Sequence, residues 1–179
     1  MTDFSITRPD PAEYAHYYAR YIDSVPSGHI IRRLQGQMAE TLDLIAGLTE
    51  KESLRRYAPE KWSIKEVLGH IIDCERICAY RALRFGRNDK CSLAGFRQDD
   101  YVREAGFDRI PLKGMAKAYQ HVREATVDLF ESLKAEDWQK TGIANELAVS
   151  VRSLAWIISG HEQHHKKVIL TRYLHVENI

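Results

Sequence analysis

Residues 150–173 read SVRSLAWIISGHEQHHKKVILTRY and form the most informative segment of the chain. Apolar residues recur in it at the spacing of an amphipathic helix, namely Val151, Leu154, Ala155, Ile158, Val168 and Ile169. The same spacing places His161 and His165 on the buried face. Because helical residues four positions apart lie one above the other, these two rings project toward one point and could bind one metal ion.

A buried imidazole needs a partner, since an unpaired buried polar group costs about 1–3 kcal/mol. The alternative to a metal site is a pair of core histidines that are satisfied by hydrogen bonds. His164 points about 100° away from His165 on a helical wheel, so we place it at the edge of the site.

The composition favours one domain and excludes some partners. The chain has 179 residues, 44% of them hydrophobic, which is enough for one domain with a core, and we predict a single domain over residues 1–179. Lys and Arg number 26 against 25 Asp and Glu, without a basic block, so no nucleic-acid partner is expected.

The sequence also bears on the compartment. No apolar run approaches the ~20 residues of a membrane span, and residues 1–5 lack a basic and apolar leader. Three cysteines do not suggest a disulfide framework. We therefore predict a cytoplasmic protein that does not associate with membranes.

Helical periodicity dominates, and the alternation typical of β-strands is nearly absent. We predict a short N-terminal helix over residues 10–23 and four long helices over about 31–48, 63–86, 111–134 and 150–173. Tyr14, Tyr17, Tyr18 and Tyr21 share one face of the short helix. We interpret them as a packing stripe in preference to a ligand platform.

The second long helix has a clear start, because Ser63 and Glu66 have the spacing of a capping box. The segment 86–110 that follows it is too long for a helix hairpin, and it predicts a crossover. The second and third long helices would then run parallel in a four-helix bundle. Asp99, Asp100 and Tyr101 of the crossover could line a substrate pocket or belong to a solvated connector.

A catalytic metal site commonly has three protein ligands, so a third ligand should come from a facing helix. His70 is the candidate if the second and fourth long helices are neighbours. Cys74 and Cys78 also have the four-residue spacing, but we interpret them as core residues. Three neutral imidazoles suit zinc or nickel. Asp73 or Glu75 could orient one of them, although solvated charges on the helix are the simpler account of both.

Residues 161–165 also satisfy the H-E-x-x-H pattern of zinc proteases, with Glu162 as general base. That function needs a further ligand downstream and an edge strand that binds substrate. Only 14 residues follow His165, and no strand-rich segment precedes the motif, so we set the protease aside.

Five blocks of the chain together resemble the DinB-like superfamily, which includes the YfiT-type metal-dependent hydrolases: residues 62–73, 75–76, 80–84, 95–102 and 160–165. The resemblance implies an all-α four-helix bundle in up-down-down-up order. It also implies a divalent metal held by three histidines, here His70, His161 and His165. Members that use bacillithiol or mycothiol imply a low-molecular-weight thiol as co-substrate.

We therefore predict a metal-dependent enzyme that acts on a small-molecule substrate, either as an S-transferase that uses a thiol or as a hydrolase. A bound divalent ion lowers the pKa of a thiol or water enough to supply a nucleophile near neutral pH. Asp73, Glu162 and His164 are the candidate catalytic residues, for tuning the site or relaying protons. The alternative is a non-catalytic metal- or ligand-binding stress protein, which could be a homodimer.

Overall fold

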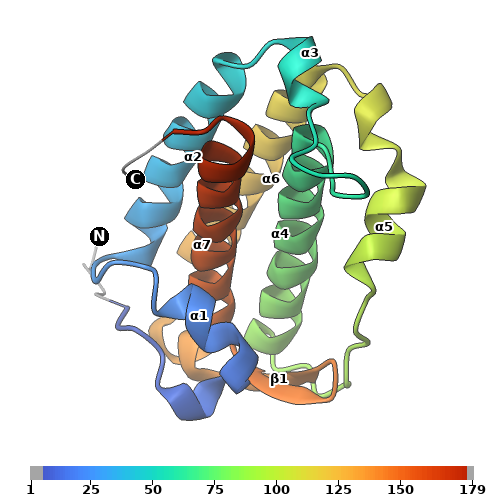
Figure 1. Ribbon diagram of the computed structural model, residues 1–179. Coiled ribbons are helices and arrows are strands. Elements are labelled where there is room, and N and C mark those ends of the chain that lie inside the picture. The colour runs from blue at the N-terminus through green and yellow to red at the C-terminus, as the bar shows by residue number, and fades with distance from the viewer. Residues whose placement is uncertain (1–5, 177–179) are drawn as a thin grey trace.

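Four long helices build the protein in a computed structural model that describes residues 6–176 (Figure 1). They are α2 (Ile30–Ala46), α4 (Ile64–Gly86), α6 (Leu112–Glu131) and α7 (Val151–Val168). A short helix, α3 (Glu50–Ser53), lies between the first two. Residues 1–5, considered above for a leader, lie outside the described residues.

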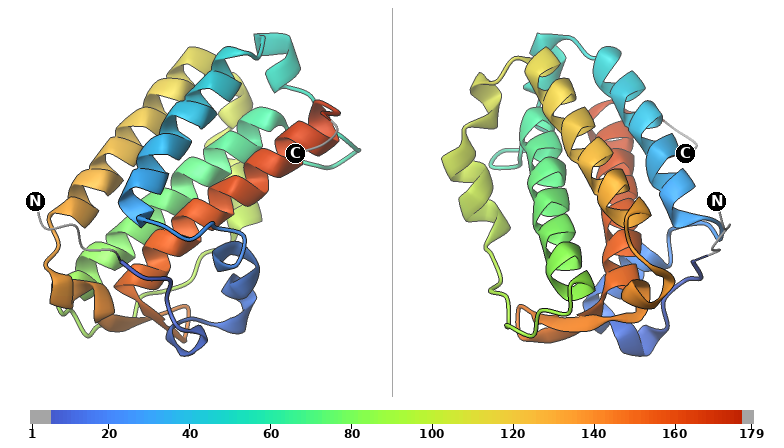
Figure 2. Two further views of the ribbon diagram at one scale, coloured as in Figure 1. Left: turned by 90° about the vertical axis from the view of Figure 1, so that its left-hand side faces the viewer. Right: turned by 180° about the vertical axis from the view of Figure 1, so that it is seen from behind.

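The helices follow the predicted up-down-down-up order. In Figures 1 and 2, α2 and α7 run in one direction and α4 and α6 run in the other. Helix α4 packs against both α6 and α7, and α2 packs against the same two helices. The second and fourth long helices are therefore neighbours, as a shared histidine site requires.

The crossover between the parallel helices α4 and α6 is confirmed, but it is partly helical. It contains α5 (Gln98–Ala105), which packs on the outside of α4, and the 3₁₀ helix η3 (Phe107–Arg109). Gly106 ends α5 in the left-handed conformation, at φ 61°, where glycine is favoured.

Local capping explains where the long helices begin. The Ser63 hydroxyl accepts a hydrogen bond from the Glu66 backbone N–H at 3.1 Å, and the Glu66 carboxylate accepts one from the Ser63 N–H at 2.7 Å, which confirms the capping box. Ser150 caps α7 in a similar way. Helix α7 continues as one π-helical segment, η5 (Ile169–Tyr173), so the predicted end near Tyr173 is confirmed.

The N-terminal segment differs from the single helix predicted over residues 10–23. It is broken into η1 (Pro11–Glu13), η2 (His16–Tyr18) and α1 (Ala19–Ile22). The chain is extended at Tyr14, with φ −150° and ψ 158°, and this conformation places the Tyr14 ring in the core. Burial of that ring explains why the helix is interrupted.

The expectation that β-structure would be nearly absent is confirmed apart from one short hairpin, which the sequence did not predict. After the 3₁₀ helix η4 (Ala135–Gln139), strands β1 (Thr141–Ala144) and β2 (Leu147–Ser150) form an antiparallel hairpin. Asn145 and Glu146 turn it with φ 52° and 65°, the backbone of a type I′ turn. Strands of four residues are too short to show a recognisable alternation.

Apolar side chains from all four long helices fill the interior of the bundle. One cluster surrounds Trp156 and Phe130, and another surrounds Leu68 and Met115. Within residues 6–176, no helix has both the length and the apolar character that a membrane crossing demands.

Candidate metal centre

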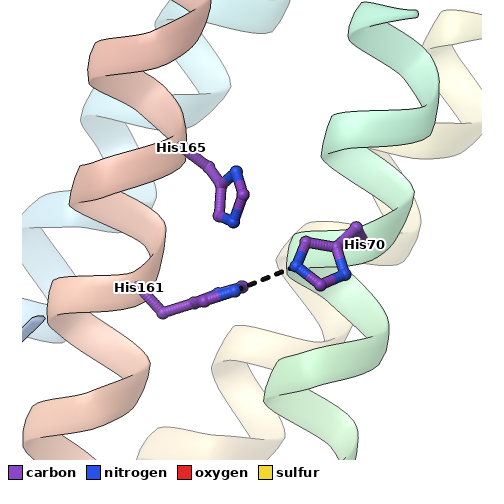
Figure 3. Close-up of side chains that lie close together, drawn as sticks. All are labelled: His70, His161 and His165. Carbon is purple, nitrogen blue, oxygen red and sulfur yellow. Dashed lines mark hydrogen bonds between the residues drawn. The ribbon is translucent and has the colours of Figure 1, made fainter. Parts of the chain in front are cut away.

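Three histidines meet between α4 and α7, as the sequence predicted. His70 comes from α4, and His161 and His165 come from successive turns of α7. Figure 3 shows the rings converging on the space between the two helices. The Nε2 atoms of His70 and His161 are 3.0 Å apart, and one nitrogen of each ring lies within 4.8 Å of the others.

These imidazoles are held in the neutral form. Burial lowers the pKa of His70 from 6.5 to about 4. Burial and the neighbouring histidines lower the pKa of His165 to about 3, and the pKa of His161 well below its ordinary value. Metal ligation requires neutral imidazole, so the three rings are in the right protonation state near pH 7.

The donor set fits a divalent metal better than it fits a hydrogen-bonded core. His70 and His161 are within hydrogen-bonding distance of each other. His165 makes ring contacts with His70, His161 and His164, yet within residues 6–176 its side chain forms no hydrogen bond. Hydrogen bonds within the described part of the protein therefore do not satisfy His165, whose ring nitrogens are not sealed from solvent. Three neutral imidazoles facing one point suit a divalent metal ion.

Aromatic neighbours hold the rings in place. The Trp62 ring packs against His70 with centroids 4.8 Å apart, and Tyr21 of α1 contacts His161 edge-on at 5.4 Å. The Cys74 sulfur lies 3.5 Å from Nδ1 of His70. The site is therefore built by α4, α7 and the N-terminal segment together.

Two of the candidate catalytic residues lie near the histidine cluster without joining it. His164 is exposed, and its ring contacts Tyr21 and His165, as its predicted place at the edge of the site implies. Asp73 on α4 pairs with Arg76 at 3.0 Å and makes no hydrogen bond to the histidines.

The Glu162 side chain points from α7 toward α2 and α6 and does not join the cluster. Its Oε1 accepts hydrogen bonds from the Thr41 hydroxyl at 2.5 Å and the Tyr119 hydroxyl at 2.7 Å, and its Oε2 pairs with Arg123. All of its side-chain hydrogen bonds go to this buried network. These contacts give Glu162 a structural role, and its catalytic role stays a prediction.

Arg123 of α6 is the centre of that network. Fully buried, it binds both oxygens of Glu75 on α4 at 2.7 and 2.8 Å, and it also pairs with Glu162 on α7. Burial acts to lower the pKa of Arg123, but the two carboxylates outweigh it and raise that pKa well above its ordinary value. One guanidinium thus connects the two helices that carry the histidines.

The sequence reasoning did not identify this network. The sequence does contain a pattern that could have revealed the network. Glu75 falls on the apolar face of its helix, one turn after Ile71, and Arg123 falls one turn after the buried Tyr119. Charged residues at such positions need buried partners. Which partners they have depends on contacts between helices.

A cavity of about 480 Å³ lies beside the histidine cluster, and His161 is part of its wall. Tyr17, Tyr18 and Tyr21 line it. Tyr14 and Tyr21 are also buried in the core and Tyr18 packs against it, as the packing-stripe interpretation predicts, whereas Tyr17 is exposed. The other lining residues come from α4, the crossover, the hairpin turn and α7: Ile71, Cys74, Glu75, Cys78, Arg81, Gly95, Phe96, Arg97, Gln98, Asp99, Asn145, Leu147, Ile157 and Ile158.

Two further expectations bear on this cavity. Cys74 and Cys78, interpreted as core residues, lie in its wall, and Cys78 also packs against the core cluster that surrounds Trp156. Of the three crossover residues considered for a pocket, Asp99 lines the cavity. Asp100 pairs with Arg97, and Tyr101 packs against the Phe96 ring, so these two contact lining residues without lining the cavity themselves.

The fold and the histidine cluster define a four-helix bundle with a three-histidine site between its second and fourth long helices. The sequence pattern of the DinB superfamily matches residues 33–169, which is more than half of the chain. The chain belongs to the DinB superfamily.

Among solved structures, the chain is similar to YfiT from Bacillus subtilis, described as a probable metal-dependent hydrolase with an unusual four-helix bundle topology. The TM-score is 0.67 at 9% identity, over 93% of this chain and 89% of that chain. At this identity the likeness shows the shared fold alone. No curated protein sequence gives a significant match.

Proposed function

We propose that the protein is a divalent-metal-dependent enzyme that acts on a small molecule, with the ion held by His70, His161 and His165. One observation carries this proposal: His161 belongs both to the histidine cluster and to the wall of the cavity. A molecule bound in the cavity would therefore lie beside the ion. The description of YfiT as a probable metal-dependent hydrolase supports the same class of function.

When bound, a zinc or nickel ion would lower the pKa of a water or a thiol enough to supply a nucleophile near neutral pH. The chain's own residues prepare the site for it. Burial keeps the three imidazoles neutral. Trp62 packs against the His70 ring and Tyr21 against the His161 ring, and these contacts orient the two imidazoles.

Hydrolysis and thiol-dependent S-transfer are the two reactions that we propose. Cys78 lines the cavity, but burial raises the pKa of its thiol to about 11, so this side chain stays protonated near pH 7. S-transfer would therefore require a low-molecular-weight thiol from solution as co-substrate.

The test begins with elemental analysis of protein purified without added metal, followed by assays of the metal-loaded and metal-free forms. One assay uses esters and amides, and the other uses a small thiol with an electrophile. We expect one activity that needs both the metal and His161. A sulfur-to-metal charge-transfer band on adding a thiol to cobalt-loaded protein would assign S-transfer, whereas hydrolysis without such a band would assign the hydrolase.

A non-catalytic metal- or ligand-binding protein is the second candidate. It is favoured by the commitment of Glu162 to Arg123 and of Asp73 to Arg76, which leaves neither carboxylate bonded to the histidine cluster. A metal-loaded protein that is inactive in both assays would support this candidate.

The compartment and the assembly are part of the same proposal. All three cysteines are free thiols, which supports a reducing compartment such as the cytoplasm. The homodimer, and the absence of nucleic-acid and membrane partners, stay predictions.

A further inference from the structure

Arg81 of α4 is a buried cation in the wall of the cavity. Its side chain is 5% exposed, and it donates one hydrogen bond, from a guanidinium nitrogen to the Ala94 carbonyl at 3.0 Å. Arg81 forms no ion pair with any carboxylate within residues 6–176. The other guanidinium nitrogens of Arg81 are not among the side-chain atoms that are both buried and unpaired. They therefore remain accessible from the cavity.

The other buried cations of the described chain are neutralised. Lys65 pairs with Glu50 at 2.6 Å, and Arg123 pairs with Glu75 at 2.7 Å. A buried charge without a counter-charge is costly. The fold neutralises two of its buried cations and leaves Arg81 as the exception.

The neighbours of Arg81 do not supply the missing negative charge. Burial raises the pKa of the Cys78 thiol, one turn earlier on α4, to about 11, so this thiol is neutral near pH 7. Glu75 is bound by both of its oxygens to Arg123. Asp99 is exposed to solvent in the crossover, where water screens its charge. None of these three neighbours supplies a counter-charge, so the guanidinium is available to an anion that enters the cavity.

We propose that Arg81 binds the carboxylate of an organic acid whose apolar body fills the cavity. A guanidinium presents two parallel N–H groups that match the two oxygens of a carboxylate. The body would contact the aromatic side chains of Tyr17, Tyr18 and Phe96. The reacting end of the acid would point toward His161, and this last step rests on the proposed function.

The charge of the cavity favours a monocarboxylate over a phosphate. Arg81 is its one buried uncompensated cation in the described part of the chain, whereas a phosphate carries close to two negative charges. Arg97, the other arginine in the lining, is exposed and pairs with Asp100 at 3.1 Å. At about 480 Å³ the cavity falls within the usual size range of small-molecule sites.

The first experiment uses the unaltered protein. Aromatic and aliphatic monocarboxylates, among them 3-phenylpropionate and benzoate, are titrated by NMR at pH 7.5, each beside its uncharged amide. We expect at least one acid to bind about tenfold to a hundredfold more tightly than its amide, because charge-assisted hydrogen bonds are worth about 1.5–3 kcal/mol. A set in which no acid binds better than its amide would overturn the proposal.

The second experiment assigns the preference to Arg81. Arg81→Gln should reduce the affinity for the acid to that for the amide, and Arg81→Lys should leave an intermediate preference. Arg87→Gln, which removes an exposed cation at the end of the same helix, should keep the full preference. A preference that survives in both Arg81 variants would overturn the assignment.

Repeating both titrations on metal-free protein separates this inference from the proposed function. Carboxylate binding that depends on Arg81 but not on metal supports the anion site even if the protein proves to be no metalloenzyme. Binding that depends on metal and ignores Arg81 contradicts the anion site and leaves the metal centre standing.

Discussion

His164 and His165 are adjacent in the sequence but have different surroundings, and this difference can be measured. His165 and His161 point into the cluster with His70, whereas His164 is exposed at its edge. We expect His161→Ala or His165→Ala to abolish stoichiometric binding of the metal, measured by elemental analysis after dialysis. His164→Ala is the matched control and should retain nearly full metal content. Full metal content in both ligand variants would refute the site.

Glu162 offers a second test at the level of single residues. Because its carboxylate accepts hydrogen bonds from Thr41 and Tyr119 and pairs with Arg123, Glu162→Gln should lower the free energy of unfolding. The expected loss is about 1.5–3 kcal/mol, the range for hydrogen bonds to charged groups. Urea denaturation measures it, and metal content should stay unchanged. Unchanged stability together with lost activity would support the predicted catalytic role of Glu162.

The histidines also predict a dependence of stability on pH in the metal-free protein. His70 has a pKa of about 4 when folded and 6.5 when exposed, so the unfolded chain binds more protons between these values. The contribution of neutral His70 to the free energy of unfolding is fully present above pH 6.5 and is lost progressively as the pH falls toward 4. The loss from His70 alone is about 3 kcal/mol, at about 1.4 kcal/mol per pKa unit.

Urea denaturation of chelated protein at pH 7.5 and pH 4.5 measures this dependence. His70→Gln cannot gain the proton and should therefore show a smaller loss of stability on acidification. Equal losses in the variant and the unaltered protein would show that other groups cause the effect.

At the level of elements, Gly160 sets how closely α1 approaches α7. A Cβ atom at this position would lie 2.1 Å from the backbone carbonyl oxygen of Tyr21, and backbone cannot easily move aside. We expect Gly160→Ala to displace α1 and to cost about 1–3 kcal/mol, the usual range for overpacking. Urea denaturation measures the cost.

Gly36→Ala on α2 is the matched control, because a Cβ atom there would contact nothing within 4 Å. Replacing a helical glycine at an open position should raise stability by about 0.5–1 kcal/mol. Equal effects of the two substitutions would refute the close approach of α1 and α7.

The elements that the sequence predicted are those specified by local signals. Helix α4 begins at a capping box, and α7 has a regular apolar stripe, so their bounds were close to the observed ones. The N-terminal segment was mispredicted because its helix is interrupted to bury Tyr14, which is a tertiary contact. The hairpin was missed because its strands are short.

In the site, too, the residues that follow from local spacing were predicted and those that depend on contacts between distant segments were not. Four-residue spacing identified His161 and His165 from one helix, and the neighbouring helix then supplied His70. The role of Tyr21 in the cavity, and the pairing of Arg123 with Glu75 and Glu162, arise between distant segments. Spacing within one helix does not report such contacts.

At the level of the whole molecule, removal of the metal should lower the melting temperature. The ion would bind only the folded arrangement of His70, His161 and His165, and selective binding to the folded state stabilises it. Thermal unfolding before and after chelation, with metal content verified, measures the effect. Re-addition of zinc should restore the original curve, and coincident curves for the loaded and chelated forms would contradict the prediction.

The distance along the chain between the ligands has a topological consequence. His70 and His161 are 91 positions apart, and the crossover, α6 and the hairpin all lie between them. An ion shared by these two residues would close that segment into a ring, as a covalent cross-link does, and would reduce the conformational entropy available to it. The N-terminal segment and α2 lie outside the ring. They could detach while the ring stays closed, whereas separating α4 from α7 would first require release of the ion.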